Sequence, residues 1–196
     1  VTKVESHITE KTKCILPVHL YGQCVDMDEL IALARKYKLS IIEDCAQAQG
    51  AEYKGYKAGS MSNASTTSFY PTKILGAYGD GGMIITNDAE VEGKLRRLRF
   101  YGAEKMYYAI EHGYNSRLDE VQAAILLTKL PHLDQYIKRR REIAYLYNEL
   151  LKDTNLILPK EADYGKHAYY LYVVRHSNRD EIMAALKENN IFVNIS

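Results

Sequence analysis

The sequence predicts an α/β protein, because short apolar stretches with strand character alternate with stretches of helical periodicity. Residues 14 to 20 (CILPVHL) and 39 to 45 (LSIIEDC) are apolar enough for buried strands, and a helical pattern lies between them. A strand, a helix and a strand within residues 13 to 45 match the length of a right-handed parallel crossover. The chain has 196 residues, which fits one domain or one domain plus part of another.

The first helix is expected at residues 27 to 37, where apolar side chains recur at helical spacing. Asp26 occupies the N-cap position and Glu29 follows three residues later, the arrangement of a reciprocal capping box. After the second strand, residues 54 to 59 (KGYKAG) indicate a surface turn. The β-branched and aromatic residues 65 to 70 (STTSFY) predict a third strand.

A glycine-rich loop, PTKILGAYGDGG at residues 71 to 82, separates the third strand from a fourth strand at residues 83 to 86. The loop lacks the Lys-Ser/Thr ending of a P-loop, and a strand rather than a helix follows it. We therefore interpret it as a tight turn. Its glycines, which would adopt positive φ values, are Gly76, Gly79, Gly81 and Gly82.

The second half of the chain is predominantly helical. Helical patterns occur at residues 88 to 100, 117 to 130, 132 to 152 and 178 to 189, and Pro131 marks the junction of two of them. Residues 101 to 116 have no clean period, whereas strands are expected at residues 168 to 175 and 191 to 196. The run from Arg139 to Arg141 is interpreted as a solvated helix face. We expect a small α+β domain, entered through the helix at residues 132 to 152.

Composition argues against several functional classes. Twenty-six Lys and Arg against 25 Asp and Glu leave a net charge of +1, which argues against a nucleic-acid partner. No apolar run approaches the roughly 20 residues needed to cross a bilayer, so no membrane partner is expected. Cys14, Cys24 and Cys45 have neither metal-knuckle nor disulfide-framework spacing, and the histidines lack an HExxH pattern. We expect buried thiols in the cytoplasm and no metal site.

Asp44 and Lys73 are the strongest candidates for chemistry. Asp44 ends a buried strand, where open parallel sheets place ligand-binding groups, although a helix cap or a loop hydrogen bond is an alternative role. Glu43 should point to the opposite side of that strand, so the two carboxylates are not an acid/base pair. Lys73 has apolar neighbours that would lower its pKa and make it a nucleophile towards carbonyls, but a solvated loop lysine is the alternative.

Other polar residues near strand and helix ends have structural interpretations. Asn115 or Ser116 could cap the helix that follows, and His19 could be a strand-end histidine with satisfied hydrogen bonds. Ser68 and Arg117 could equally be cap or turn residues. None of these residues is specific for a function by itself.

Four motifs, in this order, resemble the DegT/DnrJ/EryC1/StrS family: PVHLYGQ (17 to 23), IEDCAQAQG (42 to 50), SFYPTKILGAYGDGG (68 to 82) and GYNSRLDEVQAAIL (113 to 126). Members are pyridoxal-phosphate-dependent aminotransferases of fold type I that act on nucleotide-linked keto sugars. The resemblance implies an aspartate-aminotransferase-like large domain, with a mixed, mostly parallel sheet, of which residues 1 to 131 are part. Residues 132 to 196 would be the linking helix and part of the small α+β C-terminal domain.

The resemblance implies a role for five residues. Lys73 matches the family's Schiff-base lysine, which also carries the proton, and Asp44 matches the carboxylate that pairs with the pyridine nitrogen of pyridoxal 5'-phosphate. Gln47 matches a residue beside the phenolic oxygen, and Ser68 matches a phosphate ligand. Asn115 matches a phosphate ligand that comes from the neighbouring subunit, which implies a homodimer with a shared active site.

The implied reaction moves an amino group from glutamate to a keto sugar linked to a nucleoside diphosphate. The motif GYNSRLDE and the tyrosine-rich stretch before it favour a dTDP-3-keto-6-deoxyhexose over a UDP- or GDP-4-keto sugar. The dehydratase branch of the family has histidine at the lysine position, so Lys73 argues against it. A non-catalytic α/β nucleotide-binding module is the alternative from another class.

Two features differ from the family pattern. Gln49 stands where many members have histidine, which leaves the role of that position open. The resemblance also leaves out the N-terminal part of the family's large domain and its C-terminal end. The N-terminal part includes the helix start that binds the cofactor phosphate. We therefore expect these 196 residues alone to bind the cofactor poorly.

Overall fold

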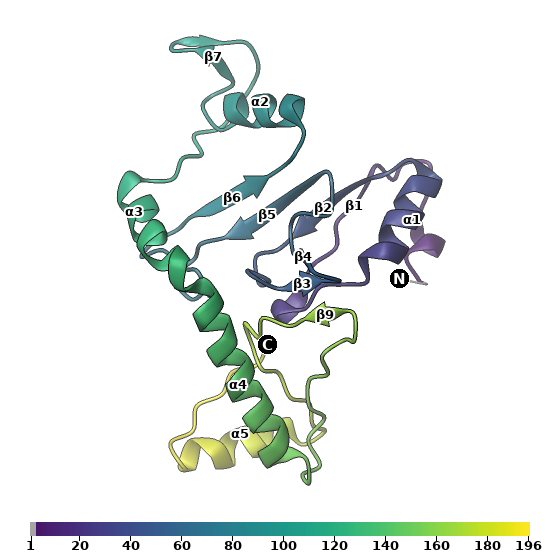
Figure 1. Ribbon diagram of the computed structural model, residues 1–196, viewed down its shortest axis with the longest axis vertical. Helices are drawn as coiled ribbons and strands as arrows, with labels where there is room; N and C mark the ends of the chain where they lie inside the picture. Colours follow the sequence, from purple (N-terminus) through teal and green to yellow (C-terminus); the bar gives the residue numbers. More distant parts are fainter. Residues whose placement is uncertain (1–2) are drawn as a thin grey trace.

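The computed structural model describes residues 3–196; the first two residues of the predicted large-domain part lie outside this range. Its centre is a four-stranded sheet in the order β1-β2-β5-β6 (Figure 1), formed by β1 (Cys14–Ile15), β2 (Ser40–Asp44), β5 (Ala64–Ser68) and β6 (Gly82–Ile85). The first three strands are parallel and β6 runs antiparallel to β5. The predicted α/β class with a mixed, mostly parallel sheet is confirmed.

Helix α1 (Met27–Tyr37) joins β1 to β2 and has the predicted boundaries. It buries Met27, Leu30, Leu33 and Ala34. Asp26 does occupy the N-cap position, but its side chain makes no cap hydrogen bond, so the expected capping box is wrong. The Tyr53 hydroxyl instead donates to Asp26 Oδ1 at 2.8 Å and takes up the oxygen that a cap would use.

The predicted surface turn is the end of a hairpin. Strands β3 (Glu52–Tyr53) and β4 (Tyr56–Lys57) pair antiparallel, and β9 (Gly165–Lys166) pairs with β3 on the other side. The two turn residues, Lys54 and Gly55, have φ values of 47° and 86°. Such a turn matches the twist of a two-residue hairpin.

Helix α2 (Ala89–Leu98) and a small hairpin of β7 (Ala103–Lys105) and β8 (Tyr108–Ala109) extend away from the central sheet (Figure 1). Asp88 caps α2, because Asp88 Oδ1 accepts hydrogen bonds from the amides of Glu90 and Val91. The hairpin occupies the region without a clean period. Its strands are too short and too exposed for an alternating pattern to develop.

Two helices continue from the sheet region, α3 (Glu120–Lys129) and the long α4 (Leu133–Leu151), joined by a short 3-10 turn (Leu130–His132) that contains Pro131. The predicted break at Pro131 is confirmed. Asp119, not Asn115 or Ser116, is the N-cap residue of α3. Ile137 of α4 belongs to the main core with Met27 and Ile41, so α4 is anchored to the sheet unit. Helix α5 (Arg179–Glu188) lies at the same end of the molecule's long axis as the last turns of α4 (Figure 1).

The strands expected at residues 168 to 175 and 191 to 196 are wrong. The nearest strand is β9, and within the first range only Arg175 pairs, in an isolated bridge with Ile157. The amides of Ala168 and Leu171 donate to the carbonyls of Gly22 and Tyr21, which belong to a 3-10 turn (Leu20–Gly22), not to a neighbouring strand. β-propensity was overridden by this tertiary contact.

Within residues 3–196, no helix combines the length and the apolar character that crossing a membrane requires.

Candidate functional site

The candidate site lies where the parallel strands end. Asp44, the last residue of β2, is in register with Thr66 of the parallel strand β5. Strand β5 ends two residues further on, at Ser68, so the two strands end at the same edge of the sheet. Gln47 follows β2, and Lys73 belongs to the loop that follows β5. The structure therefore brings four of the five predicted residues to the loops at one edge of the sheet, which is the edge where open α/β sheets bind ligands.

Asp44 is half-buried and held by its backbone. Its amide donates to the Pro17 carbonyl and its carbonyl accepts from His19, while Oδ1 accepts a hydrogen bond from the Ala46 amide at 2.9 Å. The last bond is the loop hydrogen bond anticipated as the structural role of Asp44. It occupies one carboxylate oxygen and is compatible with a ligand at the other.

Glu43 points away from Asp44 and is completely buried, as the strand alternation predicts. One of its carboxylate oxygens accepts from His19 Nε2 at 2.8 Å, and three further donors complete the shell: the amides of Gly59 and Met61 and the hydroxyl of Ser62. The Val25 amide donates to His19 Nδ1, so the proton of the imidazole is on Nε2. The interpretation of His19 as a histidine with satisfied hydrogen bonds is confirmed, but its place at the end of a strand is wrong, because β1 ends at Ile15 and His19 precedes the 3-10 turn at Leu20–Gly22.

The charge of Glu43 is stabilised inside the protein. Burial alone would raise the pKa of the Glu43 carboxyl, but the hydrogen bonds from His19 and the other donors outweigh burial and hold that pKa below its usual value. Cys45 lies beside the pair, and its thiol pKa is raised by burial and by the Glu43 charge. Because the Glu43 oxygens already accept four hydrogen bonds, we assign this cluster to the core.

Lys73 is half-buried between the buried residues Ile74 and Leu75 on one side and the exposed Tyr70 to Thr72 segment on the other. Its ammonium nitrogen lies 4.6 Å from the centre of the Tyr170 ring, a cation–π contact. The Tyr170 hydroxyl is also 3.2 Å from Thr72 Oγ1. Lys73 is therefore packed against an aromatic ring instead of being a freely solvated loop lysine.

The glycines after Lys73 are needed for space and not for backbone conformation. None of Gly76, Gly79, Gly81 and Gly82 has a positive φ, so the predicted positive-φ turn is wrong. A Cβ on Gly76 would lie 2.5 Å from the Pro71 carbonyl oxygen, and one on Gly81 would lie 2.9 Å from Leu118 Cδ1. Close packing of the loop against itself and its neighbours explains these residues.

Two glutamines link this edge of the sheet to neighbouring backbone. Gln47 Oε1 accepts from the Tyr21 amide at 2.8 Å. Gln49 Nε2 donates to the carbonyls of Ser68 at 2.8 Å and Leu75 at 3.1 Å, and Gln49 Oε1 accepts from the Leu75 amide at 2.7 Å. The sequence left the role of Gln49 open, because its partners are distant backbone groups that no motif reveals.

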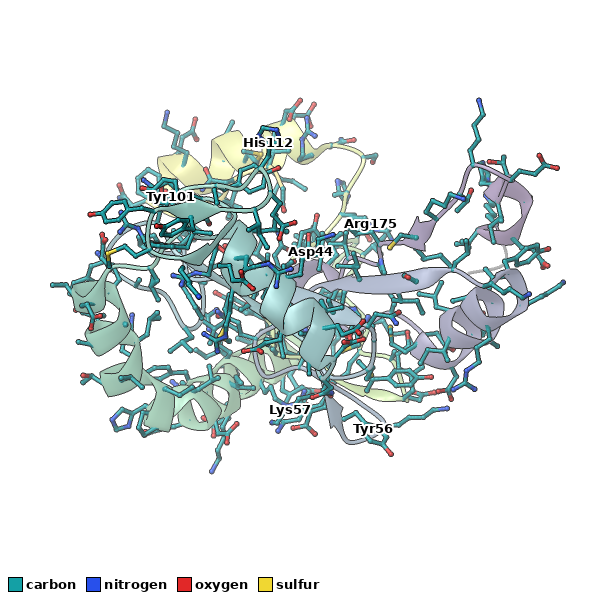
Figure 2. All side chains as sticks on the ribbon, turned by 90° about the horizontal axis from the view of Figure 1, so that it is seen from above. Asp44, Tyr56, Lys57, Tyr101, His112 and Arg175 are labelled. Atoms are coloured by element: carbon teal, nitrogen blue, oxygen red, sulfur yellow. The ribbon has the colours of Figure 1, made fainter. Side chains whose placement is uncertain are left out.

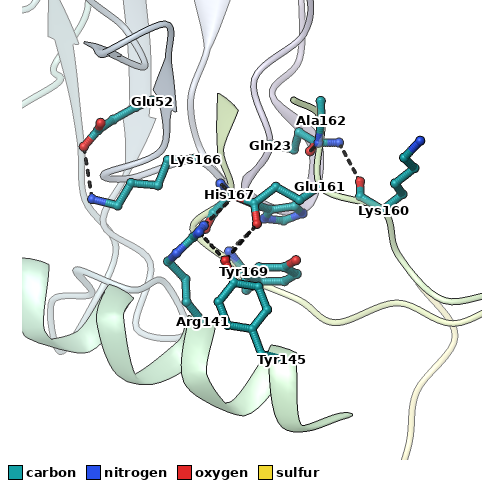
Figure 3. A network of polar contacts seen from close by, with 10 residues as sticks. All are labelled: Gln23, Glu52, Arg141, Tyr145, Lys160, Glu161, Ala162, Lys166, His167 and Tyr169. Carbon is teal, nitrogen blue, oxygen red and sulfur yellow. Dashed lines mark hydrogen bonds and ion pairs between the residues drawn. The ribbon is translucent and has the colours of Figure 1, made fainter. Parts of the chain in front are cut away.

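The arginine run is not a solvated face throughout. Arg140 donates to the carbonyls of Tyr169 and Tyr170 at 3.2 Å each. Arg141 forms an ion pair with Glu161 and donates to the His167 carbonyl (Figure 3). Only Arg139 is exposed as predicted. These contacts fix the segment that carries Tyr170, and periodicity missed them because the partners come from an irregular segment.

Asn115 lies apart from the other candidates. It pairs with Phe100 in an isolated bridge, and its Oδ1 accepts from Arg117 Nε at 3.1 Å, beside the β7–β8 hairpin. The hairpin projects beyond α2, away from the central sheet (Figure 1), and Figure 2 shows Tyr101 and His112 of this region together with Asp44, seen from above. Ser68 is at the main site, where its hydroxyl oxygen accepts from the Tyr70 amide at 3.2 Å.

Fold and site together define an α/β protein whose sheet presents a carboxylate and a packed lysine at its ligand-binding edge. The chain belongs to the DegT/DnrJ/EryC1/StrS aminotransferase family, whose model matches residues 1–195.

Curated relatives and solved structures agree with this assignment. The chain is 53% identical to a dTDP-3-amino-3,4,6-trideoxy-alpha-D-glucose transaminase of Micromonospora megalomicea subsp. nigra, covering 98% of this chain and 53% of the relative. It is 51% identical to a pleiotropic regulatory protein of Geobacillus stearothermophilus, covering 96% of this chain and 52% of the relative. The crystal structure of S. venezuelae DesV in complex with a ketimine intermediate superposes with a TM-score of 0.94 at 44% identity, covering 96% of this chain and 51% of that chain.

Further relatives are named for dTDP-, UDP- and GDP-linked sugars. The chain spans about half the length of the curated relatives it matches.

Proposed function

We propose that the protein of which this chain is part is a pyridoxal-phosphate-dependent aminotransferase acting on a nucleotide-linked keto sugar. The single observation that carries the proposal is the meeting of Asp44, Ser68 and Lys73 at the carboxyl edge of β2 and β5. An acid, a hydroxyl and an amine at one sheet edge match the pyridine nitrogen, the phosphate and the aldehyde of the cofactor. When bound, pyridoxal phosphate supplies an electron sink for the carbon that exchanges its amine.

The residues have distinct roles in this proposal. The Asp44 carboxylate would hold a proton on the pyridine nitrogen, and the Ala46 amide fixes its orientation. Lys73 would bind the cofactor aldehyde and move the proton at the reacting carbon, through its side-chain nitrogen. Ser68 would donate its hydroxyl to the phosphate, and Gln47 would lie beside the phenolic oxygen. The Tyr170 ring would cover Lys73.

For the substrates, we propose glutamate as the amino donor and a dTDP-3-keto-6-deoxyhexose as the favoured acceptor. The names of relatives at 53% and 51% identity support a 3-amino sugar carried by dTDP. Relatives named for UDP and GDP sugars, at 45% and 38% identity, support the alternative of a UDP- or GDP-linked sugar. The product would be an amino sugar for polysaccharide or glycosylated-metabolite biosynthesis.

We further propose a homodimer in which Asn115 reaches the phosphate in the partner's site. Its exposure and its pairing with Phe100, at the end of α2 and beside the projecting hairpin, support this. Residues 1 to 131 would belong to the large domain, and residues 132 to 196 to the linking helix and part of the small domain. The three free cysteines of the described chain support a reducing cytoplasmic location.

The test uses the full-length protein with glutamate and a panel of dTDP-, UDP- and GDP-linked keto sugars. Amine formation is followed by mass spectrometry, and the covalent link between lysine and cofactor is trapped with borohydride and located by peptide mapping. We expect trapping on Lys73 and loss of both link and turnover in Lys73→Ala. Lys94→Ala, at an exposed position of α2, should retain both.

A non-catalytic regulatory protein is the second candidate, favoured by the name of the Geobacillus relative. Under that hypothesis Lys73→Ala should have no effect on any property of the protein other than local stability. Normal turnover in Lys73→Ala, or absence of any turnover with the whole panel, would contradict the proposed aminotransferase.

A further inference from the structure

Gln49 connects the two loops that carry the proposed catalytic groups. It belongs to the segment that follows Asp44, and its side chain bonds to backbone on both sides of Lys73, at Ser68 and at Leu75. Ser68 comes just before that loop and Leu75 comes two residues after the lysine. A single side chain thereby links the two ends of the lysine segment to each other and to the carboxylate segment.

The amide group of Gln49 is matched to its surroundings. A primary amide offers two N–H donors and one carbonyl acceptor. Here both donor bonds go to backbone carbonyls and the acceptor receives the Leu75 amide, at distances between 2.7 and 3.1 Å. No other side chain of similar size supplies this set of donors and acceptor, since imidazole has a single donor and a single acceptor when neutral.

Gln49 is itself rigidly placed. Its neighbour Ala48 is fully buried, and Gly50 has a φ of 74°. A Cβ on Gly50 would lie 2.1 Å from Ile137 Cδ1, so the backbone beside Gln49 is packed directly against α4. The three hydrogen bonds of Gln49 therefore start from a fixed point of the core.

We propose that Gln49 is a positioning residue that sets Lys73 relative to Asp44, so that the amine meets the cofactor aldehyde when Asp44 holds the ring nitrogen. This proposal rests on the proposed function. Its physical basis is that a displacement of about 1 Å in a reacting group can reduce the rate about a hundredfold. Gln49 acts through the backbone of Ser68 and Leu75 and needs no contact with substrate.

The test compares three variants in the full-length protein. Gln49→Leu removes all three bonds, Gln49→Glu places carboxylate oxygens against two carbonyls, and Gln49→His keeps one donor and one acceptor. The control is Gln23→Leu, since Gln23 also binds two backbone groups, the Lys160 carbonyl and the Ala162 amide, away from Lys73.

We expect kcat to fall about tenfold to a hundredfold in Gln49→Leu and Gln49→Glu, with KM for the sugar changed less than about threefold. Gln49→His should retain kcat within roughly fivefold, as conservative rescue. In the cofactor-free protein, hydrogen exchange of the Leu75 amide should accelerate in Gln49→Leu and not in Gln23→Leu. In the cofactor-loaded protein, the absorbance band of the cofactor bound through lysine should be weaker in Gln49→Leu than in wild type.

A kcat of Gln49→Leu within about twofold of wild type, or an equal loss in Gln23→Leu, would overturn the proposal. If Gln49→Leu fails to fold, Gln49→His and Gln49→Glu still discriminate, because a purely structural role predicts no difference in kcat between them once both are folded. Failure of the proposed function is recognised separately. If the proposed function is wrong, Lys73→Ala retains turnover. If only the positioning role of Gln49 is wrong, Lys73→Ala loses turnover while the Gln49 variants keep it.

Discussion

The ammonium nitrogen of Lys73 lies 4.6 Å from the centre of the Tyr170 ring, although the two residues belong to opposite halves of the chain. Arg140 holds the Tyr170 carbonyl from α4, and the Tyr170 hydroxyl meets Thr72. A residue from the C-terminal half of the chain therefore contacts the proposed catalytic lysine. This relationship makes the irregular segment around Tyr170 part of the site.

Replacement of Tyr170 should weaken the contact between these two parts of the chain. We expect Tyr170→Leu to lower the free energy of unfolding by about 1 to 2 kcal/mol, because it removes the ring over Lys73 and the hydroxyl at Thr72. Tyr170→Phe keeps the ring and should lose less than about 1 kcal/mol. Urea unfolding and limited proteolysis of the full-length protein measure both. Equal losses in the two variants would show that the ring contact contributes nothing.

Two arginines of the run from Arg139 to Arg141 should differ sharply in their effect on stability. Arg141 and Glu161 form an ion pair with side chains about one-fifth exposed, at 19% and 20%. We expect Arg141→Met to cost about 2 to 3 kcal/mol, because it leaves the Glu161 carboxylate and the His167 carbonyl without this donor. Arg139→Met, at an exposed ion pair with Glu142, should cost less than about 0.5 kcal/mol.

A double-mutant cycle of Arg141→Met and Glu161→Gln isolates the pair. The expected coupling energy is about 1 to 2 kcal/mol, measured by chemical denaturation. Additive effects of the two substitutions would contradict direct interaction between these side chains.

Glu43 should be indispensable for the core despite having no catalytic role. Glu43→Leu leaves the imidazole of His19 and three other donors without an acceptor, so we expect loss of several kcal/mol and a largely insoluble protein. Glu43→Gln keeps the shape and should cost about 2 to 3 kcal/mol. An exposed control, Glu188→Gln, should be neutral in the same thermal melts.

The Glu43 carboxylate also predicts a loss of stability in acid. Because the folded-state pKa of Glu43 is depressed, its stabilisation is fully present above the unfolded pKa and is lost as pH falls through the folded pKa. The Glu43→Gln variant should therefore lose less stability than wild type when both are acidified from pH about 5 downwards. Parallel pH curves for the two proteins would rule out this contribution.

His167 should make stability pH-dependent in a higher range. Burial lowers the pKa of His167 to about 4, so the folded protein disfavours the protonated imidazole. The free energy of unfolding should fall as pH decreases from about 6.5 to about 4, by at most about 1.4 kcal/mol per pH unit, because the unfolded chain takes up the proton first. Urea unfolding between pH 7 and pH 4 measures this slope.

The His167→Gln variant should show a flatter dependence in that range. His112→Gln, at an exposed position of the hairpin region, is the matched control and should retain the wild-type slope. A wild-type slope in His167→Gln would show that other groups cause the loss of stability at low pH.

By itself, the sequence predicted most of the local elements and indicated the candidate site residues, whose roles stay a proposal. Helix α1, the strands around Asp44 and Ser68, and the break at Pro131 follow from periodicity, β-propensity and backbone restriction, which act over a few neighbouring residues. The motifs around Asp44 and Lys73 were sufficient to indicate the family.

Only the tertiary structure decided which distant groups meet. The bonds of Gln49 to the lysine loop, the ring of Tyr170 over Lys73 and the ion pair of Arg141 all join residues that are far apart in the chain. The predicted strand at residues 168 to 175 was wrong for the same reason, because its amides bond to the 3-10 turn at Leu20–Gly22. Such contacts depend on how the whole chain packs, and local propensity carries no information about them.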